Sequence, residues 1–277
     1  MTKKKPVLNA SLGGGARTRL CVVAVMMLGC AGANGEEDED AGPAIATTTE
    51  AFTSVTRSTF FAGPGPETSY VSLGPTAGQT CFLTGVSGHL HNSAAGVRSD
   101  RITGGVQYFD LVIVLNAPGQ WLLAQAACVS SVLNRTPEVA GPNPITHRTF
   151  VAAGTQNRRC FLTNVHAGTL DSQGDSVRVG RDAVDGNWYL TGTAGVSARA
   201  RCIDVTTNLM SLTLSGGNVD ATRTLVADSP GTACLLTHIG GAFTNSHIFG
   251  GSRLYPFDGM WHALASAGKS VGVNCVN

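Results

Sequence analysis

The stretch CFLTGV at residues 81–86 decides the fold, because it returns as CFLTNV at residues 160–165 and as CLLTHI at residues 234–239. In each copy both the odd and the even positions are largely apolar, which is typical of a central strand that is covered on both faces. A motif that recurs along a chain is the signature of a repeat protein. The sequence therefore predicts three copies of one β unit, each with roughly four to six antiparallel strands.

The residues around these motifs also follow strand patterns. Residues 198–202 alternate small apolar side chains with Arg199 and Arg201, as expected of a strand with one buried face. Asp-Gly pairs at 185–186 and 258–259 stand just before a tryptophan-containing strand and predict hairpins. No convincing amphipathic helix follows the first thirty residues, so we expect an all-β fold of tandem antiparallel repeats.

Two tryptophans keep the same register. Trp188 and Trp261 both stand fourteen positions before the last cysteine of their repeat, which favours a core position over a sugar-stacking one. In the first repeat Gly119 lies nine positions before the last cysteine, against seven for its counterparts. Val112 is therefore predicted to occupy the place of the tryptophans, with Trp121 displaced.

We place the repeats at residues 57–130, 131–204 and 205–277. Two arrangements are open: a compact one around a pseudo-threefold axis, prism-like or sandwich-like, and a string of separate units. The connecting segments 129–147 and 203–222 contain Val, Leu and Ile, which favours extra strands packed between units and hence the compact arrangement.

Six of the eight cysteines lie at matching positions, two in each repeat: Cys81, Cys128, Cys160, Cys202, Cys234 and Cys275. Cysteines pair in an oxidising compartment. Six cysteines allow 15 pairings, and the symmetry of the repeats favours the one within each repeat: Cys81–Cys128, Cys160–Cys202 and Cys234–Cys275. No two cysteines have the two-to-four-residue spacing of zinc sites, so we expect no metal.

The N-terminus is typical of an export signal, with five basic residues and no acidic one before a short apolar run at residues 20–28. The end of that run, Met27-Leu28-Gly29-Cys30, resembles the lipobox of bacterial lipoproteins. The resemblance implies that residues 1–29 are a signal peptide, and that Cys30 is lipidated and anchors the protein to the outer membrane or cell surface. Cleavage after Ala33, giving a periplasmic or fully secreted protein, is the alternative.

Residues 30–56 are predicted to form a lipidated, flexible tether. Five consecutive acidic residues at 36–40 repel one another and remain solvated.

Composition excludes several classes of protein. Charged residues make up 13% of the chain and apolar residues 43%, which does not fit a disordered chain. A polytopic membrane protein is excluded because no second long apolar run follows the first thirty residues. A formal net charge of +1 argues against nucleic-acid binding. Residues 51–277 keep 14 basic and 12 acidic residues, so strong steering of a charged partner is not expected.

The sequence holds no recognisable catalytic constellation or cofactor motif. It has neither a Gly-x-Ser-x-Gly elbow nor a glycine-rich phosphate loop that opens a helix. The first repeat departs most from the others, and its His89, His91, Asp100 and Asp110 are where a hydrolase site would lie, the least favoured alternative.

Three arginines occupy roughly corresponding places in the repeats: Arg98, Arg178 and Arg253. We interpret them as solvent-facing strand residues beside inward-facing neighbours. Contact with an anionic ligand is the alternative.

The Cys-Phe-Leu-Thr-x-Val repeat is similar to one found in uncharacterised bacterial surface and phage-tail-associated proteins. The similarity covers residues 57–277 and implies no activity. We therefore expect a non-enzymatic cell-surface lipoprotein whose repeated units bind a glycan or a surface protein and whose Cys30 attaches it to the membrane. A purely structural envelope component is the alternative.

Overall fold

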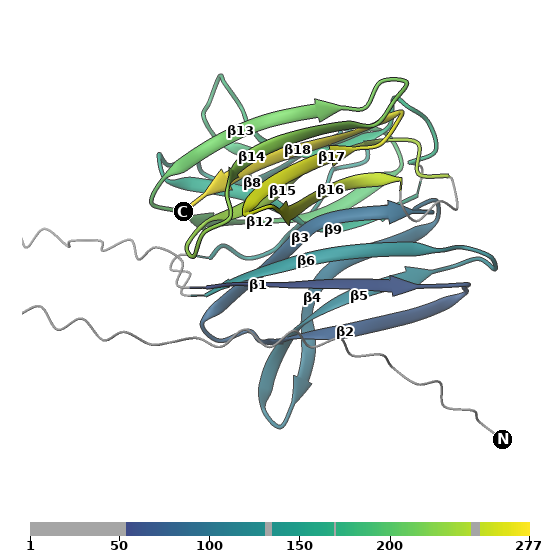
Figure 1. Ribbon diagram of the computed structural model, residues 1–277, viewed down its shortest axis with the longest axis horizontal. Coiled ribbons are helices and arrows are strands. Elements are labelled where there is room, and N and C mark those ends of the chain that lie inside the picture. The colour runs from purple at the N-terminus through teal and green to yellow at the C-terminus, as the bar shows by residue number, and fades with distance from the viewer. Residues whose placement is uncertain (1–53, 131–134, 169, 245–249) are drawn as a thin grey trace, which may run out of the picture. The chain divides into compact units, whose positions relative to one another are not determined.

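Eighteen strands, six from each repeat, make up the part of the chain that the structure describes (Figure 1). The structure is a computed structural model, and it describes residues 54–277 apart from 131–134, 169 and 245–249. The predicted signal peptide, Cys30 and residues 30–53 of the predicted tether lie outside the described residues. The last two residues placed in the tether, 55 and 56, belong to the first strand of repeat 1 instead, because they pair with Val129 and Cys128.

Each repeat contributes its strands in the same order. Repeat 1 supplies β1 (Val55–Ala62), β2 (Glu67–Pro75), β3 (Gln79–Gly88), β4 (Ser93–Thr103), β5 (Val106–Leu115) and β6 (Leu122–Ser130). Repeat 2 supplies β7 (Val139–Gly141), β8 (Arg148–Ala152), β9 (Arg158–Ala167), β10 (Ser176–Arg181), β11 (Trp188–Gly192) and β12 (Val196–Asp204). Repeat 3 supplies β13 (Asn208–Ser215), β14 (Ala221–Ala227), β15 (Ala233–Gly241), β16 (Gly251–Phe257), β17 (Met260–Ala265) and β18 (Lys269–Val276).

The strands form three six-stranded sheets, and every sheet is shared by two repeats. The strand orders are β1-β6-β3-β16-β17-β14 in sheet A, β2-β5-β4-β9-β12-β7 in sheet B and β13-β18-β15-β10-β11-β8 in sheet C. In each sheet the first, sixth and third strands of one repeat continue into the fourth, fifth and second strands of another. Repeat 1 joins repeat 3, repeat 3 joins repeat 2 and repeat 2 joins repeat 1, so the cycle closes. The predicted all-β, threefold arrangement is confirmed, and a string of separate units is excluded.

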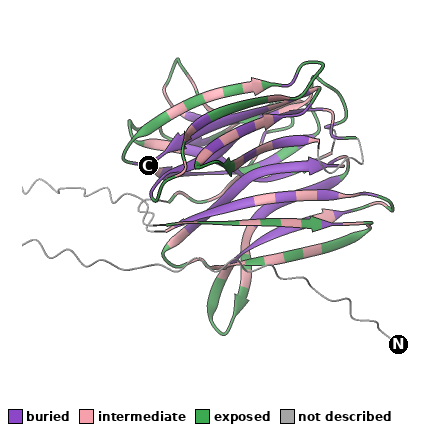
Figure 2. Cartoon of the chain, viewed as in Figure 1, coloured by how far each residue is buried: buried purple, intermediate pink, exposed green. Residues whose placement is uncertain are grey.

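The strands that carry the Cys-Phe-Leu-Thr motif, β3, β9 and β15, are covered on both faces, as predicted. Figure 2 shows β3 buried along almost its whole length. Cys81, Leu83 and their counterparts face the large core within the repeats. On the opposite face Phe82, Phe161 and Leu235 belong to a second apolar cluster, in which all three repeats take part.

A β-bulge at the threonine of each motif changes the alternation of side chains. Leu83 pairs with Ala126 and Gly85 with Gln125, so Thr84 is the extra residue. The same irregularity occurs at the corresponding threonines of β9 and β15. A bulge adds one residue and so reverses which face the following side chains occupy. Val86 therefore joins Leu83 in the repeat core, where strict alternation would place it beside Phe82.

The segments that follow β3, β9 and β15 are joined to one another by backbone hydrogen bonds between repeats. The connection after β3 carries Leu90, whose amide donates to the carbonyl of Phe243 at 2.9 Å. The amide of Phe243 donates to the carbonyl of Leu170 at 2.7 Å. All three side chains are fully buried, so the corners of the three repeats hold one another in place.

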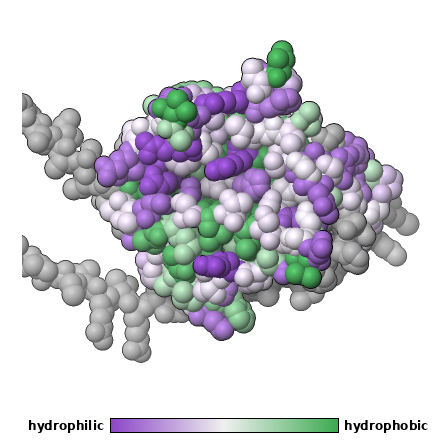
Figure 3. All heavy atoms as spheres, turned by 90° about the horizontal axis from the view of Figure 1, so that it is seen from above, coloured by the Kyte–Doolittle hydropathy of each residue, from purple (hydrophilic) through white to green (hydrophobic). Residues whose placement is uncertain are grey.

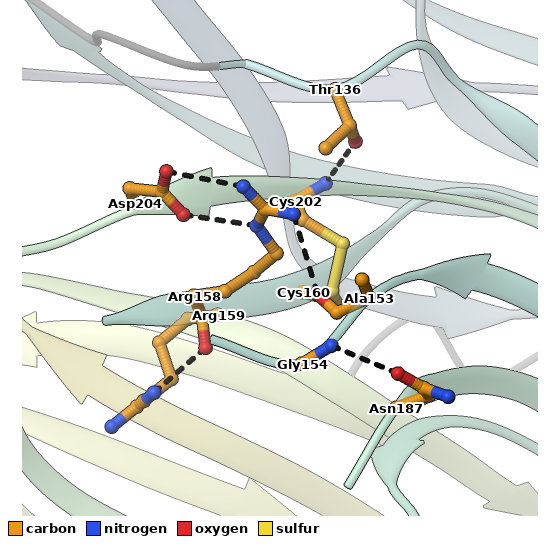
Figure 4. The surroundings of a disulfide bond; sticks show 9 residues. All are labelled: Thr136, Ala153, Gly154, Arg158, Arg159, Cys160, Asn187, Cys202 and Asp204. Carbon is orange, nitrogen blue, oxygen red and sulfur yellow. Dashed lines mark hydrogen bonds and ion pairs between the residues drawn. A yellow bond between two sulfur atoms is a disulfide. The ribbon is translucent and has the colours of Figure 1, made fainter. Parts of the chain in front are cut away.

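The six repeat cysteines form three disulfides, in the pairing within each repeat that the symmetry favours: Cys81–Cys128, Cys160–Cys202 and Cys234–Cys275. In each case the two residues stand directly opposite each other on neighbouring strands. Figure 4 shows the second disulfide beside the ion pair of Arg158 and Asp204, whose Nε and Oδ1 atoms lie 2.9 Å apart. Disulfides of this kind are typical of proteins that fold in an oxidising, exported environment.

Where two repeats meet in a sheet, three residues on neighbouring strands form a row on the face of the sheet that points away from the repeat cores. We call these the junction rows. They are Gln125, Gly85 and Arg253 in sheet A, Arg199, Asn164 and Gly96 in sheet B, and Gly272, His238 and Arg178 in sheet C.

Each junction row contains one glycine, on a different strand in each sheet. A Cβ atom at Gly96 would lie 2.1 Å from Nδ2 of Asn164, and one at Gly85 would lie 2.8 Å from Cγ of Arg253. A Cβ atom at Gly272 would lie 2.6 Å from Cβ of His238. The glycine thus gives the neighbouring large side chain the space that it occupies.

The junction rows correct the predicted register of the first repeat. Gly96, and not Arg98, is the counterpart of Arg178 and Arg253. Counted from these rows, Phe109 takes the place of the tryptophans, and Val112 does not. The reason is that β5 runs two residues past Ile113, the counterpart of Gly192, and that the connection between β5 and β6, residues 116–121, is longer than its counterparts at 193–195 and 266–268. Trp188 and Trp261 are 5% and 0% exposed, so they are core residues and have no face for a sugar.

None of the described residues forms a helix that is long and apolar enough to cross a membrane.

We predict that replacing both cysteines of one repeat by alanine, as in Cys160→Ala with Cys202→Ala, lowers the free energy of unfolding by about 4 kcal/mol, because each disulfide closes a loop of some 40 residues. Urea denaturation would measure the loss. Reducing agent, which opens all three disulfides, should destabilise the wild type by more than this. A double variant with unchanged stability would contradict the prediction.

We also predict that Gly96→Ala lowers the free energy of unfolding by about 1–3 kcal/mol, because the new methyl group overpacks against Asn164. In an Asn164→Gly background the same substitution should cost much less. Gly174→Ala is the matched control, since the nearest atom to a Cβ there is 3.8 Å away. Equal costs of Gly96→Ala in both backgrounds would show that the junction row does not constrain the position.

Candidate functional site

A groove crosses the outer face of sheet B, where repeats 1 and 2 meet. It has a volume of about 630 Å³. Its lining comes from β4, β7, β8, β9, β12 and the connection between β7 and β8: Arg98, Ala140, Gly141, Pro142, Asn143, Pro144, Thr149, Asn164, His166, Ser197, Ala198 and Arg199. We call it the sheet B groove.

Two cross-strand rows of β9 and β12 form its floor. Arg199 stands opposite Asn164, and Ser197 stands opposite His166. The Ser197 hydroxyl donates to the backbone carbonyl of His166 at 3.2 Å and lies 3.3 Å from its Nδ1 atom. Successive outward positions of neighbouring strands thus place amide, imidazole, hydroxyl and guanidinium groups side by side.

The wall of the groove is a hydrogen-bonded turn at residues 142–147. The side-chain oxygen of Asn143 accepts from the amides of Ile145 at 2.8 Å and Thr146 at 3.1 Å. The amide of Asn143 donates to Oγ1 of Thr149 at 2.9 Å, and the amide of His147 donates to the carbonyl of Asn143 at 2.8 Å. Such a turn fixes the wall in one conformation.

This wall exists because repeat 2 departs from the repeat pattern. Its first strand, β7, has 3 residues, whereas β1 and β13 have 8 each. The shortened strand pairs only with residues 198–200 of β12. The turn at 142–147 lies beside the rest of β12 and creates a hollow that the threefold pattern alone would not produce.

The groove is lined by cations and by no carboxylate. Nη1 of Arg199 lies 3.0 Å from Oε2 of Glu138, whose other oxygen accepts from Oγ1 of Thr163 at 2.6 Å. Glu138 therefore holds Arg199 in position from outside the groove. Arg98, at the β4 side, forms no ion pair with any other residue that the structure describes.

Sheet C carries two smaller grooves, of about 300 and 170 Å³, on its own outer face. They share Arg178, Gly180 and Arg181. The smaller one also contains Arg148, whose guanidinium carbon lies 3.4 Å from the centre of the Tyr189 ring. Two of the three sheets thus present arginines in a hollow at a junction between repeats.

The structure separates the three arginines that the sequence grouped. Arg98 lines the sheet B groove and Arg178 lines both sheet C grooves, while Arg253 is half-buried in the junction row of sheet A. The remaining residues of the sheet B groove, Asn164, His166, Ser197 and Arg199, were not singled out as a site from the sequence. The shortening of β7 was their only signal, and it is visible only once strand bounds are known.

The residues of repeat 1 that would mark a hydrolase site are engaged separately. The carboxylate of Asp110 accepts two hydrogen bonds from Arg101, at 2.6 and 2.7 Å. Nδ1 of His91 lies 3.7 Å from Oδ2 of Asp171 in repeat 2. Burial, and to a lesser extent the neighbouring His91, lowers the pKa of His89. Asp100 is exposed on β4.

Within the described ranges, no three His, Cys, Asp or Glu side chains come together in a way that could hold a metal ion.

Comparison of the chain with models of protein families and with curated proteins found no match. The site is therefore interpreted from its own geometry.

His238, in the junction row of sheet C, is held neutral by its surroundings. Burial, and after it the charge of Arg178, lowers the pKa of His238 to about 4. Its Nε2 atom lies 2.7 Å from Oγ of Ser270, a hydroxyl that a neutral imidazole can bond.

We predict that this histidine makes the protein less stable as the pH falls from about 6.5 to about 4. Unfolded His238 takes up a proton near pH 6.5, whereas the folded protein resists protonation down to about pH 4, so the unfolded state binds more protons in this range. The free energy of unfolding should fall by up to about 3 kcal/mol from this residue.

Thermal or urea denaturation across this pH range would measure the effect. His238→Asn introduces the residue type that Asn164 has at the corresponding position of sheet B. The stability of this variant should depend less on pH. An identical pH dependence in the variant and the wild type would contradict the prediction.

Proposed function

We propose that this protein is an exported, lipid-anchored surface protein that binds glycans in the sheet B groove. The observation that carries the proposal is the groove itself, a rigid polar hollow formed where one repeat departs from the pattern of the other two. Binding sites in proteins are typically largely preformed concave surfaces with a few well-placed polar groups.

The chemistry of the groove suits a ligand that is rich in hydroxyl groups. The side-chain nitrogen of Asn143 and the hydroxyl of Thr149 can donate hydrogen bonds, and the hydroxyl oxygen of Ser197 and the amide oxygen of Asn164 can accept them. Their positions are set by strands and by a hydrogen-bonded turn, so little conformational entropy is lost when a ligand binds.

The shape of the groove favours a chain of sugar units. A second hollow of about 290 Å³ shares Pro142, Asn143, Pro144 and Ser197 with the groove and extends it past the turn toward Val196. The two hollows share residues of the turn and of β12. On the face of the molecule seen in Figure 3, hydrophilic side chains are interspersed among groups of apolar ones.

The proposed location rests on two lines of support. The three disulfides need an oxidising compartment. The lipobox-like residues 27–30 supply the anchor at Cys30, and an outer-membrane or cell-surface position follows from that resemblance. Mass spectrometry of the mature N-terminus tests this directly: a diacylglyceryl-modified Cys30 supports the anchor, and an N-terminus at Asn34 overturns it.

We predict that the full-length protein binds a subset of polysaccharides on a glycan array and that Ser197→Tyr weakens this binding at least about tenfold, because the new ring fills the groove. Thr68→Tyr is the matched control, since it adds the same ring to an exposed position on β2 of the same sheet, outside the groove. Titration calorimetry with the best polysaccharide would measure both variants.

A protein that binds nothing on the array would overturn the glycan proposal and favour a purely structural role in the envelope. Equal loss of binding in both variants would place the glycan somewhere other than the groove.

A further inference from the structure

We infer that the ligand is an acidic polysaccharide, whose carboxylate or sulfate groups are bound by Arg98 and Arg199 in the sheet B groove and by Arg178 and Arg181 in the sheet C grooves. The inference rests on the proposed glycan function and specifies the class of glycan.

Arg98 is a cation without an ion-pair partner among the described residues, and it lines the sheet B groove. Asp110 is the partner of Arg98 in the pairing of β4 with β5. Both oxygens of that carboxylate, however, accept hydrogen bonds from Arg101, and Asp110 is only 4% exposed. Arg98 is thus left facing a groove whose described lining holds a second arginine and no acidic residue.

Sheet C also presents more arginines than carboxylates: its smaller groove is lined by Arg148, Arg178 and Arg181 and by one acidic residue, Asp182. Arg178 forms no ion pair with a described residue, and Nε of Arg181 donates to the backbone carbonyl of Gly186 at 2.7 Å. Arg148, by contrast, is paired with Asp182. A bound anion would offset the charge that Arg178 and Arg181 leave without a carboxylate partner among the described residues.

A guanidinium group presents a planar fork of donors that matches the two oxygens of a carboxylate or a sulfate. The folded residues are close to neutral overall, and several of their carboxylates are engaged with other arginines, including Asp110, Asp182, Asp204 and Asp228. The attraction for an anion is therefore local to the grooves and is not a property of the whole surface.

The arrangement favours a polymer with repeated charges over a single small anion. The two arginine-bearing faces belong to different sheets and to different junctions between repeats. A chain that reaches both faces gains affinity because the second contact is intramolecular. No Phe, Tyr or Trp side chain lines the sheet B groove, which favours a polysaccharide over a nucleic acid.

The inference is tested by titrating the full-length lipidated protein, in detergent, with four polymers: polygalacturonate, dextran sulfate, uncharged dextran and single-stranded DNA. We expect polygalacturonate or dextran sulfate to bind at least about tenfold more tightly than dextran, with affinity that falls as salt is added. The first two polymers distinguish a carboxylate from a sulfate ligand.

Arginine-to-glutamine variants test which arginines bind the acidic polymer. Arg98→Gln and Arg178→Gln should each weaken binding of the acidic polymer about three- to tenfold, and the double variant should weaken it further. Arg223→Gln is the matched control: it removes the same charge from an exposed position on β14 that lines none of the described grooves, and it should leave affinity unchanged. Melting temperatures of the variants verify that they are folded.

Three results would overturn the inference. They are equal binding of dextran and the acidic polymers, equal losses in Arg223→Gln and Arg98→Gln, and binding of DNA as tight as that of polygalacturonate with the same dependence on Arg98. If dextran binds as tightly as the acidic polymers and Ser197→Tyr abolishes that binding, the glycan function stands and only the acidic class is wrong. If no polysaccharide binds, the proposed function itself fails.

Discussion

The contact of β3, β9 and β15 with one another is the constraint on which the rest of the structure depends. Phe82 and Phe161 lie with their ring centres 5.4 Å apart, and Leu235 completes the set from the third repeat. A strand that buries one face in its own repeat and the other against two neighbours cannot reach its full burial in an isolated repeat. The hydrophobic effect, which scales with the apolar area removed from water, therefore favours the closed set of three over three separate units.

The sheets make this dependence stronger. Because each sheet continues from one repeat into the next, the backbone hydrogen bonds of one repeat are completed by another. Space at these junctions is limited, and one glycine in each junction row leaves room for the large side chain beside it. The glycine lies on β3 in sheet A, on β4 in sheet B and on β18 in sheet C. Three repeats of one pattern thus reach the same packing with side-chain volume distributed differently in each sheet.

Departures from the threefold pattern are where polar chemistry collects. The short β7 and the turn beside it open the sheet B groove, and the longer connection between β5 and β6 shifts the register of repeat 1. Three disulfides and a closed cycle of sheets hold the repeats together. A change in an edge strand such as β7 is tolerated because an edge strand pairs with only one neighbour. Loops and edges carried on a rigid scaffold are common places for binding sites.

The sequence by itself determined the β class, the number of repeats, the disulfide pairing and the burial of Trp188 and Trp261. Each of these follows from periodicity or from equal spacing, and a single chain displays both. It did not determine which residues share a site, because Arg98 and Arg199 lie in different repeats and meet only through the shared sheet. The sequence also wrongly assigned Val112 to the tryptophan position and Arg98 as the counterpart of Arg178. Both positions depend on strand pairing, which the spacing of glycines and cysteines does not reveal. The bulge at Thr84 and the junction glycines likewise depend on neighbours far apart in the chain, and only the tertiary structure decided them.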